Sequence, residues 1–128
     1  MIIEKNFLEK KRMGKLILLR HGQSAWNKKN VFTGWIDIPL SQEGIEESIA
    51  AGKKIASYSI DFIYSSYLIR AQTTACLAMA QTKQIPYVQH LKEEGWYTHG
   101  AGGHSLVPMY YAKELNERMY GDLQGKNK

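Results

Sequence analysis

The 128-residue sequence contains little cysteine, little proline and no long hydrophobic run. Its single cysteine, Cys76, has no partner for an internal disulfide, which fits a reducing compartment. No apolar stretch approaches the roughly 20 residues of a membrane span. The N-terminus lacks the apolar core and small-residue cleavage site of a secretory signal. These absences predict a cytoplasmic protein that does not associate with membranes.

The net charge of +5 does not by itself indicate a nucleic-acid-binding protein. Five of the 17 basic residues lie within the first fifteen positions, and no basic run alternates with aromatic residues as in single-strand binders. A few dispersed arginines suit a small anionic ligand better. His99 and His104 lack a neighbouring cysteine and a spacing typical of metal sites, so we expect no metal.

Secondary-structure elements alternate along the sequence. The apolar run at 17–19 predicts a strand buried on both faces of a parallel sheet. Residues 62–64 and 86–88 predict two further strands. Ser41 predicts the N-cap of a helix that ends near residue 58, and a second helix is predicted over 68–81. The first helix should pack through Ile45, Ile49, Gly52 and Ile55, and the second through Ala71, Ala75 and Ala78.

This order of elements predicts an α/β fold, a mainly parallel sheet flanked by helices. Residues 1–14 are expected to form an N-terminal extension, and residues 15–128 a partial catalytic domain. The segment 94–105 is predicted to be a surface loop, and 114–128 shows no helix or strand pattern.

Chemistry-bearing side chains follow the first predicted strand. Arg20, His21 and Gly22 would lie at its carboxyl end, where open parallel sheets bind ligands. A neutral imidazole can attack phosphorus, and a guanidinium fork suits phosphate oxygens. Asn27 could donate a further hydrogen bond, and Arg70 could add charge from the second helix. From the residues alone, His21 could equally be a loop or packing residue, and the arginines surface cations.

Three extended blocks give a far more specific indication of function than these single residues: LILLRHGQSAWNKKNVFTGWIDIPLSQEG, IYSSYLIRAQTTA and ELNERMYGDLQGKNK. In this order they closely resemble the 2,3-bisphosphoglycerate-dependent phosphoglycerate mutases of the histidine phosphatase, or RHG, superfamily. The resemblance runs from about residue 15 to residue 128. It implies the phosphoglycerate mutase-like fold and an isomerase that interconverts 3-phosphoglycerate and 2-phosphoglycerate in glycolysis and gluconeogenesis.

The resemblance also implies the role of individual residues. His21 would carry the phosphoryl group as a phosphohistidine, and Glu117 would be the general acid/base. 2,3-Bisphosphoglycerate would prime His21, no metal would be needed, and the full-length protein would be a dimer or tetramer. The positions that match substrate-binding residues of the family are Arg20, Ser24, Asn27, Thr33, Gly34, Arg70, Arg118, Tyr120 and Lys128.

The sequence departs from the family pattern in two ways. Met119 stands where the commonest form has histidine, and the family's second catalytic histidine, in an (A/G)HG motif, does not occur. We therefore expect the N-terminal half of the fold, truncated at the C-terminus and inactive by itself. Two alternatives stay open: a histidine-type phosphomonoesterase, or an inactive remnant that binds anions or a partner if the chain ends at Lys128.

Overall fold

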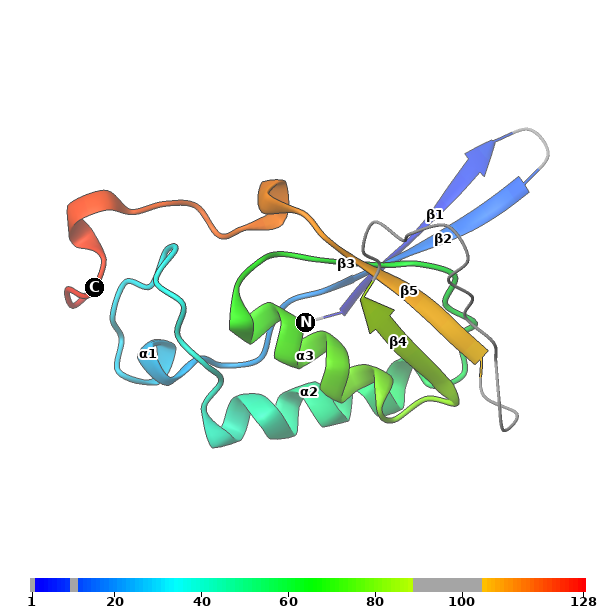
Figure 1. Cartoon of the computed structure of the whole chain (residues 1–128), viewed down its shortest axis with the longest axis horizontal. Helices are drawn as coiled ribbons and strands as arrows, with labels where there is room; N and C mark the ends of the chain where they lie inside the picture. The colour runs from blue at the N-terminus through cyan, green and yellow to red at the C-terminus, as the bar shows by residue number, and fades with distance from the viewer. Residues whose placement is uncertain (1, 10–11, 89–104) are drawn as a thin grey trace, which may run out of the picture.

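The computed structural model describes residues 2–9, 12–88 and 105–128 (Figure 1). Of the residues predicted to form a surface loop, all but the last lie outside these ranges, as do His99 and His104. No helix in the described ranges combines the length and apolarity needed to cross a membrane. The elements, in chain order, are β1 (Ile2–Glu9), β2 (Arg12–Leu19), α1 (Ala25–Lys28), α2 (Gln42–Ile55), β3 (Ile63–Ser65), α3 (Ile69–Met79), β4 (Gln84–Val88), β5 (Ser105–Tyr111), and the 3₁₀ turns η1 (Lys113–Leu115) and η2 (Gly121–Leu123).

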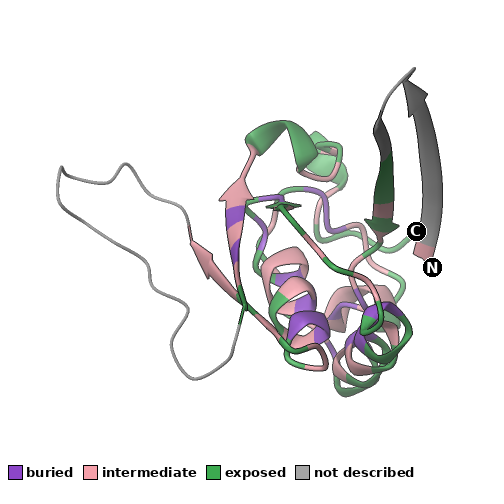
Figure 2. Ribbon diagram, turned by 90° about the vertical axis from the view of Figure 1, so that its right-hand side faces the viewer, coloured by how far each residue is buried: buried purple, intermediate pink, exposed green. Residues whose placement is uncertain are grey.

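Three parallel strands form the central sheet, in the order β3–β5–β4. Helix α3 packs against β3 and β4, and α2 packs against α3. Val107 and Met109 of β5 are almost completely buried, whereas the residues between and beside them are only partly covered. Figure 2 shows the helices on one side of these strands. The predicted α/β class with a parallel sheet and flanking helices is confirmed.

The α2–α3 interface is closer than the predicted apolar stripes imply. A Cβ atom on Gly52 would lie 2.3 Å from the backbone oxygen of Ala78, so the two helices almost touch there. Gly52 and Ile55 are buried as predicted. The predictions for Ile45, Ile49, Ala71 and Ala75 were wrong, because these side chains are only half-buried. Ala78 is buried as predicted, and four small or polar residues that were not predicted also face inward: Gly44 and Ser48 on α2, and Arg70 and Thr74 on α3.

Element boundaries follow local chemistry where that chemistry is strong. The Ser41 hydroxyl accepts a hydrogen bond from the Gly44 N–H at 3.1 Å and caps α2 as predicted. The helix ends at Ile55, three residues before the predicted position. Strand β5 was not predicted, because Pro108 interrupts its apolar alternation and proline is disfavoured inside sheets.

The prediction for the first strand was wrong in its partners and its burial. β2 pairs with β1 in an antiparallel ladder and is not part of the three-stranded sheet. Leu16 and Leu18 are 40% and 42% exposed, so the strand is not buried on both faces. An adjacent antiparallel segment can satisfy backbone hydrogen bonds through a short turn, whereas a parallel neighbour requires a long crossover. The domain boundary at residue 15 stays a prediction.

The C-terminal segment is held by the loop that follows α1. Phe32 and residue 126 are joined by an N–H···O bond of 2.9 Å, and the Gly125 N–H donates to the Phe32 oxygen at 2.9 Å. The Lys128 N–H donates to the Asn30 oxygen at 2.9 Å. Residues almost 100 positions apart in the sequence therefore form one surface.

Candidate functional site

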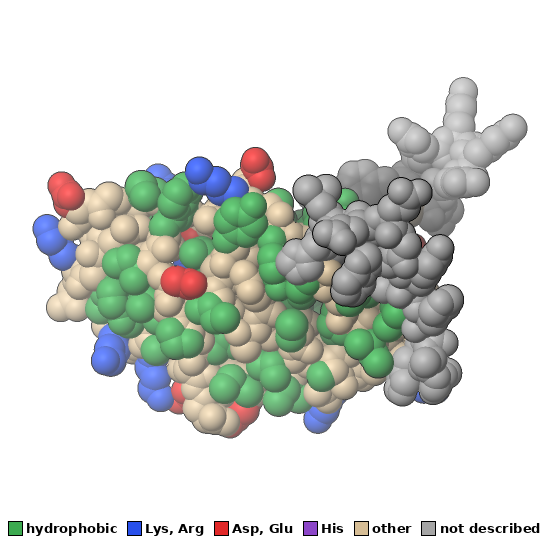
Figure 3. Space-filling model, viewed as in Figure 1, with side chains coloured by type: hydrophobic (Ala, Val, Ile, Leu, Met, Phe, Trp, Pro, Cys, Tyr) green, Lys and Arg blue, Asp and Glu red, His purple; other side chains and the backbone are tan. Residues whose placement is uncertain are grey.

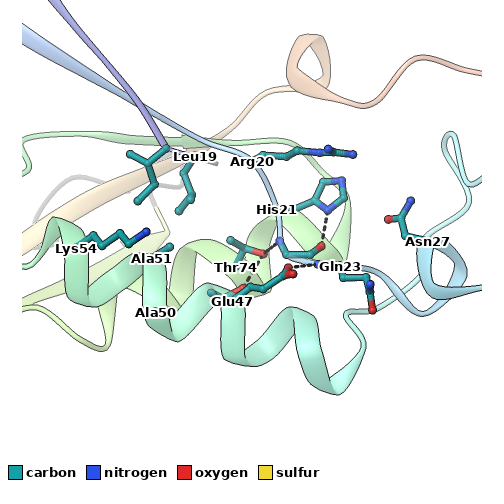
Figure 4. A pocket seen from close by; sticks show the side chains of 13 residues that line it. Leu19, Arg20, His21, Gln23, Asn27, Glu47, Ala50, Ala51, Lys54 and Thr74 are labelled. Carbon is teal, nitrogen blue, oxygen red and sulfur yellow. Dashed lines mark hydrogen bonds between the residues drawn. The ribbon is translucent and has the colours of Figure 1, made fainter.

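A pocket of about 520 Å³ lies at the carboxyl end of β2, between the β1–β2 hairpin and α2 (Figure 4). The imidazole of His21 and the guanidinium of Arg20 lie on the same side of it, and Asn27 lies across from them. Glu47 and Lys54 of α2 and Thr74 of α3 also contribute to its walls. The structure thus brings Arg20, His21 and Asn27 together, as the sequence predicts.

The hydrogen bonding of His21 determines which of its nitrogens is free. The Gly22 carbonyl oxygen lies 2.7 Å from Nδ1, and a carbonyl can only accept, so Nδ1 carries the proton. Nε2 keeps its lone pair. Burial lowers the pKa of His21 below its ordinary value of 6.5, and Arg70 and Arg20 lower it further, outweighing the Gly22 bond and Glu117. The side chain is therefore neutral at neutral pH, the state required of a nucleophile.

The backbone beside His21 is fixed by both helices. The Gly22 N–H donates to the Thr74 hydroxyl at 3.1 Å, and that hydroxyl donates to the Arg70 backbone oxygen at 2.7 Å. A Cβ atom on Gly22 would lie 2.2 Å from the backbone oxygen of Gly44. Only glycine allows the loop to approach α2 this closely.

Asn27 is oriented by Ser24 in a capping box at the start of α1. Ser24 is completely buried; its hydroxyl donates to the Asn27 Oδ1 at 2.7 Å and accepts from the Asn27 N–H at 3.0 Å. Because Oδ1 is occupied, the amide nitrogen of Asn27 is the group left to donate. Ser24 therefore orients Asn27, and its own hydroxyl has no free proton for a substrate.

Arg70 is 1% exposed, and its guanidinium donates to the Gly34 oxygen at 2.8 Å and the Ile36 oxygen at 3.1 Å. Burial lowers its pKa, and attraction to Glu117 and Asp37 opposes this shift. Two of its five N–H groups donate to groups in the described ranges, which leaves three, but Arg70 is not among the residues that line the His21 pocket. Arg70 thus links α3 to the loop that contains Thr33 and Gly34.

Thr33 has an unusual environment for a hydroxyl. It is 6% exposed, and within the described ranges its Oγ1 is buried without a hydrogen-bond partner. A buried polar atom without a partner costs about 1–3 kcal/mol, so a ligand or water that bonds to it is favoured. The adjacent Gly34 has φ +56°, and a Cβ there would collide with the side chain of Gln124.

The segment that carries Glu117 is anchored by Trp35. The indole Nε1 donates to the Glu117 backbone oxygen at 2.5 Å, and the Trp35 N–H donates to the Gln124 Oε1 at 2.7 Å. Asn116 Oδ1 accepts from the Tyr67 N–H at 2.9 Å, close to the start of α3. Glu117 borders a second pocket, of about 450 Å³, rather than the first, but its charge is near enough to raise the pKa of His21.

The remaining predicted residues surround Phe32. Tyr120 packs on it with ring centroids 5.0 Å apart, and the Lys128 Nζ lies 5.8 Å from its centroid. The Arg118 guanidinium lies 5.5 Å from the centre of the Tyr120 ring and borders the second pocket. None of these three lines the His21 pocket.

Four positioning residues were missed by the sequence analysis. The position of Thr74 could have been predicted, because it follows Arg70 by one helical turn and so lies on the same buried face of α3. Trp35 lies in the FTGW block, but nothing in the sequence shows that its indole binds the segment that carries Glu117. Glu47 and Gln124 carry no signal in the sequence, because their partners are backbone groups far away in the chain.

Comparisons with known proteins agree with this arrangement. The model of the histidine phosphatase superfamily (branch 1) matches residues 16–96. The chain is 52% identical over 122 residues to a 2,3-bisphosphoglycerate-dependent phosphoglycerate mutase of Chlamydia pneumoniae. It is 54% identical over 123 residues to the protein of the same name from Protochlamydia amoebophila. Each alignment covers 91% of this chain and 54% of the relative, so the chain spans about half the length of these relatives.

Solved structures give the same fold. YhfR of Bacillus stearothermophilus matches with a TM-score of 0.63 and 27% identity, over 84% of this chain and 42% of that protein. A mycobacterial glucosyl-3-phosphoglycerate phosphatase matches with a TM-score of 0.62 and 24% identity, over 84% of this chain and 40% of that protein. At 24% identity the second likeness concerns the fold alone.

Proposed function

Because the chain belongs to the histidine phosphatase superfamily, branch 1, we propose that it carries the phosphohistidine chemistry of a 2,3-bisphosphoglycerate-dependent phosphoglycerate mutase. The reaction is the interconversion of 3-phosphoglycerate and 2-phosphoglycerate in glycolysis and gluconeogenesis, an intramolecular phosphotransfer located in the cytoplasm. The observation that carries the proposal is the neutral His21, with Nδ1 bound to Gly22 and Nε2 free in a pocket. Relatives that share more than 50% identity with this chain are 2,3-bisphosphoglycerate-dependent phosphoglycerate mutases, which supports this choice of substrate.

The residues fit an anionic bisphosphorylated ligand. Arg20 supplies a cation beside His21, Asn27 a free amide N–H, and Thr33 a buried hydroxyl without a partner. Arg70 adds unused N–H groups from the adjacent helix. 2,3-Bisphosphoglycerate, when bound, supplies the phosphoryl group that primes the enzyme. Arg118 and Lys128 would attract its other anionic groups, because cations neutralise phosphate and carboxylate oxygens.

The proposed steps use the lone pair of His21 and one proton. The Nε2 lone pair forms a bond to phosphorus while the bond from phosphorus to the leaving oxygen breaks, and Glu117 gives that oxygen a proton. In the reverse transfer, Glu117 takes the proton of the attacking hydroxyl as the P–N bond breaks. Arg20 and Arg70 neutralise charge on the equatorial oxygens of the phosphoryl group.

The test is phosphorylation by ³²P-labelled 2,3-bisphosphoglycerate of a protein of the relatives' full length that contains this sequence, because this chain by itself is expected to be inactive. We expect an acid-labile, alkali-stable label that His21→Ala abolishes and that the control His90→Ala retains. Because the pKa of His21 is lowered, the labelling rate at pH 6.5 should exceed half of its plateau at higher pH. A label that survives His21→Ala would overturn the proposal.

The same experiment distinguishes the two alternatives. Turnover of many phosphoesters with no need for bisphosphoglycerate would favour a phosphomonoesterase. Binding of vanadate or phosphoglycerate in a calorimeter, with no label on His21, would favour an inactive anion-binding protein. The oligomeric state stays a prediction.

A further inference from the structure

We propose that Glu47 is a positioning residue for His21, which it controls through the peptide unit between Gly22 and Gln23. The inference rests on the proposed role of His21 as the nucleophile. Glu47 is an exposed residue of α2 that lines the His21 pocket. It lies outside the three sequence blocks and was not among the predicted site residues. It does not contact the imidazole itself.

The geometry joins the two side chains through one rigid group. The Gln23 N–H donates to the Glu47 Oε2 at 2.8 Å, and the Gly22 oxygen accepts from the His21 Nδ1 at 2.7 Å (Figure 4). This N–H and this C=O belong to the same peptide unit. A trans peptide is planar, and its N–H and C=O point in opposite directions. A carboxylate that holds the N–H therefore fixes the direction of the carbonyl that holds the imidazole.

The charge of Glu47 strengthens this effect. A carboxylate acceptor makes a stronger hydrogen bond than a neutral one, and consecutive hydrogen bonds polarise each other. The Gly22 oxygen becomes a better acceptor, and the Nδ1–H tautomer is stabilised over the Nε2–H tautomer. That tautomer leaves the lone pair on Nε2, where phosphoryl transfer needs it. The charges that act directly on the imidazole are Arg20, Arg70 and Glu117, so Glu47 acts through the peptide.

Other contacts hold the loop, which makes the role of Glu47 separable from folding. The Gly22 N–H is bound by Thr74, and the Ser41 N–H donates to the Gln23 oxygen at 2.9 Å. The Ser41 hydroxyl also bonds to the Gln23 side chain at 2.9 Å. Removal of the exposed Glu47 carboxylate leaves all of these bonds in place. If Glu47 only stabilised the fold, its removal would therefore change the tautomer of His21 very little.

The test measures the tautomer of His21 by long-range ¹H–¹⁵N NMR of the full chain with labelled histidine, above neutral pH. The spectrum of His21→Gln assigns the His21 signals among the four histidines. We compare the unmodified chain with Glu47→Ala, Glu47→Gln and the control Glu46→Ala. Glu46 is exposed on the same helix, and its carboxylate accepts only from Gln42 in the described ranges.

We expect the unmodified chain and Glu46→Ala to hold the proton on Nδ1. In Glu47→Ala the ratio of Nδ1–H to Nε2–H tautomer should fall about threefold to tenfold, the equivalent of one hydrogen bond. The ratio should fall less in Glu47→Gln, because the glutamine amide oxygen still accepts the hydrogen bond but carries no charge. The rate of His21 phosphorylation by phosphoramidate, a small donor that needs no binding site for glycerate, should fall by less than this factor, because the rate follows the fraction of the Nδ1–H tautomer rather than the ratio of the two tautomers.

An unchanged tautomer ratio in Glu47→Ala, with an unchanged circular dichroism spectrum, overturns the proposal. So does a proton on Nε2 in the unmodified chain. These outcomes are independent of the mutase assignment. A tautomer that responds to Glu47 while bisphosphoglycerate gives no label would leave the positioning role intact and reject the proposed function.

Discussion

At the scale of single residues, hydrogen-bond partners decide what each predicted side chain can do. The sequence suggests His21, Asn27 and Arg70 as a phosphate site, but it cannot show which atoms are free. The structure leaves Nε2 of His21 and the amide nitrogen of Asn27 available, because Gly22 and Ser24 occupy the other polar atoms. Arg70 instead holds two backbone carbonyls and keeps three N–H groups.

Replacement of Arg70 should therefore destabilise the whole chain as well as any anion site. Arg70→Met leaves the Gly34 and Ile36 oxygens without their donors in a buried region, which should lower the free energy of unfolding by about 2–4 kcal/mol. Urea unfolding followed by circular dichroism measures this loss. The control Arg118→Met removes an exposed guanidinium whose contact in the described ranges is the ring of Tyr120, so it should lose less than about 1 kcal/mol. Equal losses in the two variants would contradict the structural role of Arg70.

At the scale of elements, close backbone approach determines how the helices support the site. α2 and α3 meet at Gly52 and Ala78, and the loop after β2 meets α2 at Gly22 and Gly44. These contacts place Thr74 next to the Gly22 N–H and Glu47 next to the Gln23 N–H. The pocket therefore depends on the spacing of two helices that carry none of the reacting atoms.

A single methyl group at the helix contact should test this dependence. Gly52→Ala adds a Cβ that would lie 2.3 Å from a backbone oxygen, so the helices must move apart. Overpacking costs about 1–3 kcal/mol, while alanine gains about 1 kcal/mol in helix propensity, and here the backbone clash should win. We expect a net loss of about 1–2 kcal/mol in thermal or urea unfolding. Gly14→Ala, where nothing lies within 4 Å of the added atom, should stay within about 0.5 kcal/mol of the unmodified chain. A stabilised Gly52→Ala variant would show that the contact is not as close as described.

At the scale of the whole molecule, the sheet is covered by helices on one face only within the described ranges. Phe62 and Tyr64 are 61% and 65% exposed, and Tyr64 stacks on Tyr110 of the neighbouring strand at 5.3 Å. Ile85 of β4 is 44% exposed on the same face. Figure 3 shows hydrophobic side chains across the middle of one view of the molecule, with lysine and arginine mostly at its edges. Parallel sheets are usually covered on both faces, so this apolar surface is exceptional.

The exposed sheet face should bind hydrophobic dyes and promote self-association. Tyr64→Lys should weaken the fluorescence of bound anilinonaphthalene sulfonate and lower the average mass in concentrated solution. Stability should fall by only about 0.5–1.5 kcal/mol, because the substitution removes the stacking on Tyr110 from a side chain that is otherwise mainly solvated. Leu123→Lys, at a position 49% exposed but away from the sheet, is the matched control and should change neither signal. Equal effects of the two substitutions would mean that this face is not the site of association.

The sequence alone determines what depends on neighbours in the chain. The Ser41 cap, the α/β order and the position of His21 after a strand follow from local propensity and the covalent order of residues. Contacts between distant segments needed the tertiary structure. The insertion of β5 between β3 and β4, the burial of Arg70 against the Gly34 and Ile36 oxygens, and the bond from the Gln23 N–H to Glu47 all involve backbone groups far from their partners in the sequence. Backbone N–H and C=O groups are the same in every residue except proline, so no side-chain pattern identifies which of them will meet.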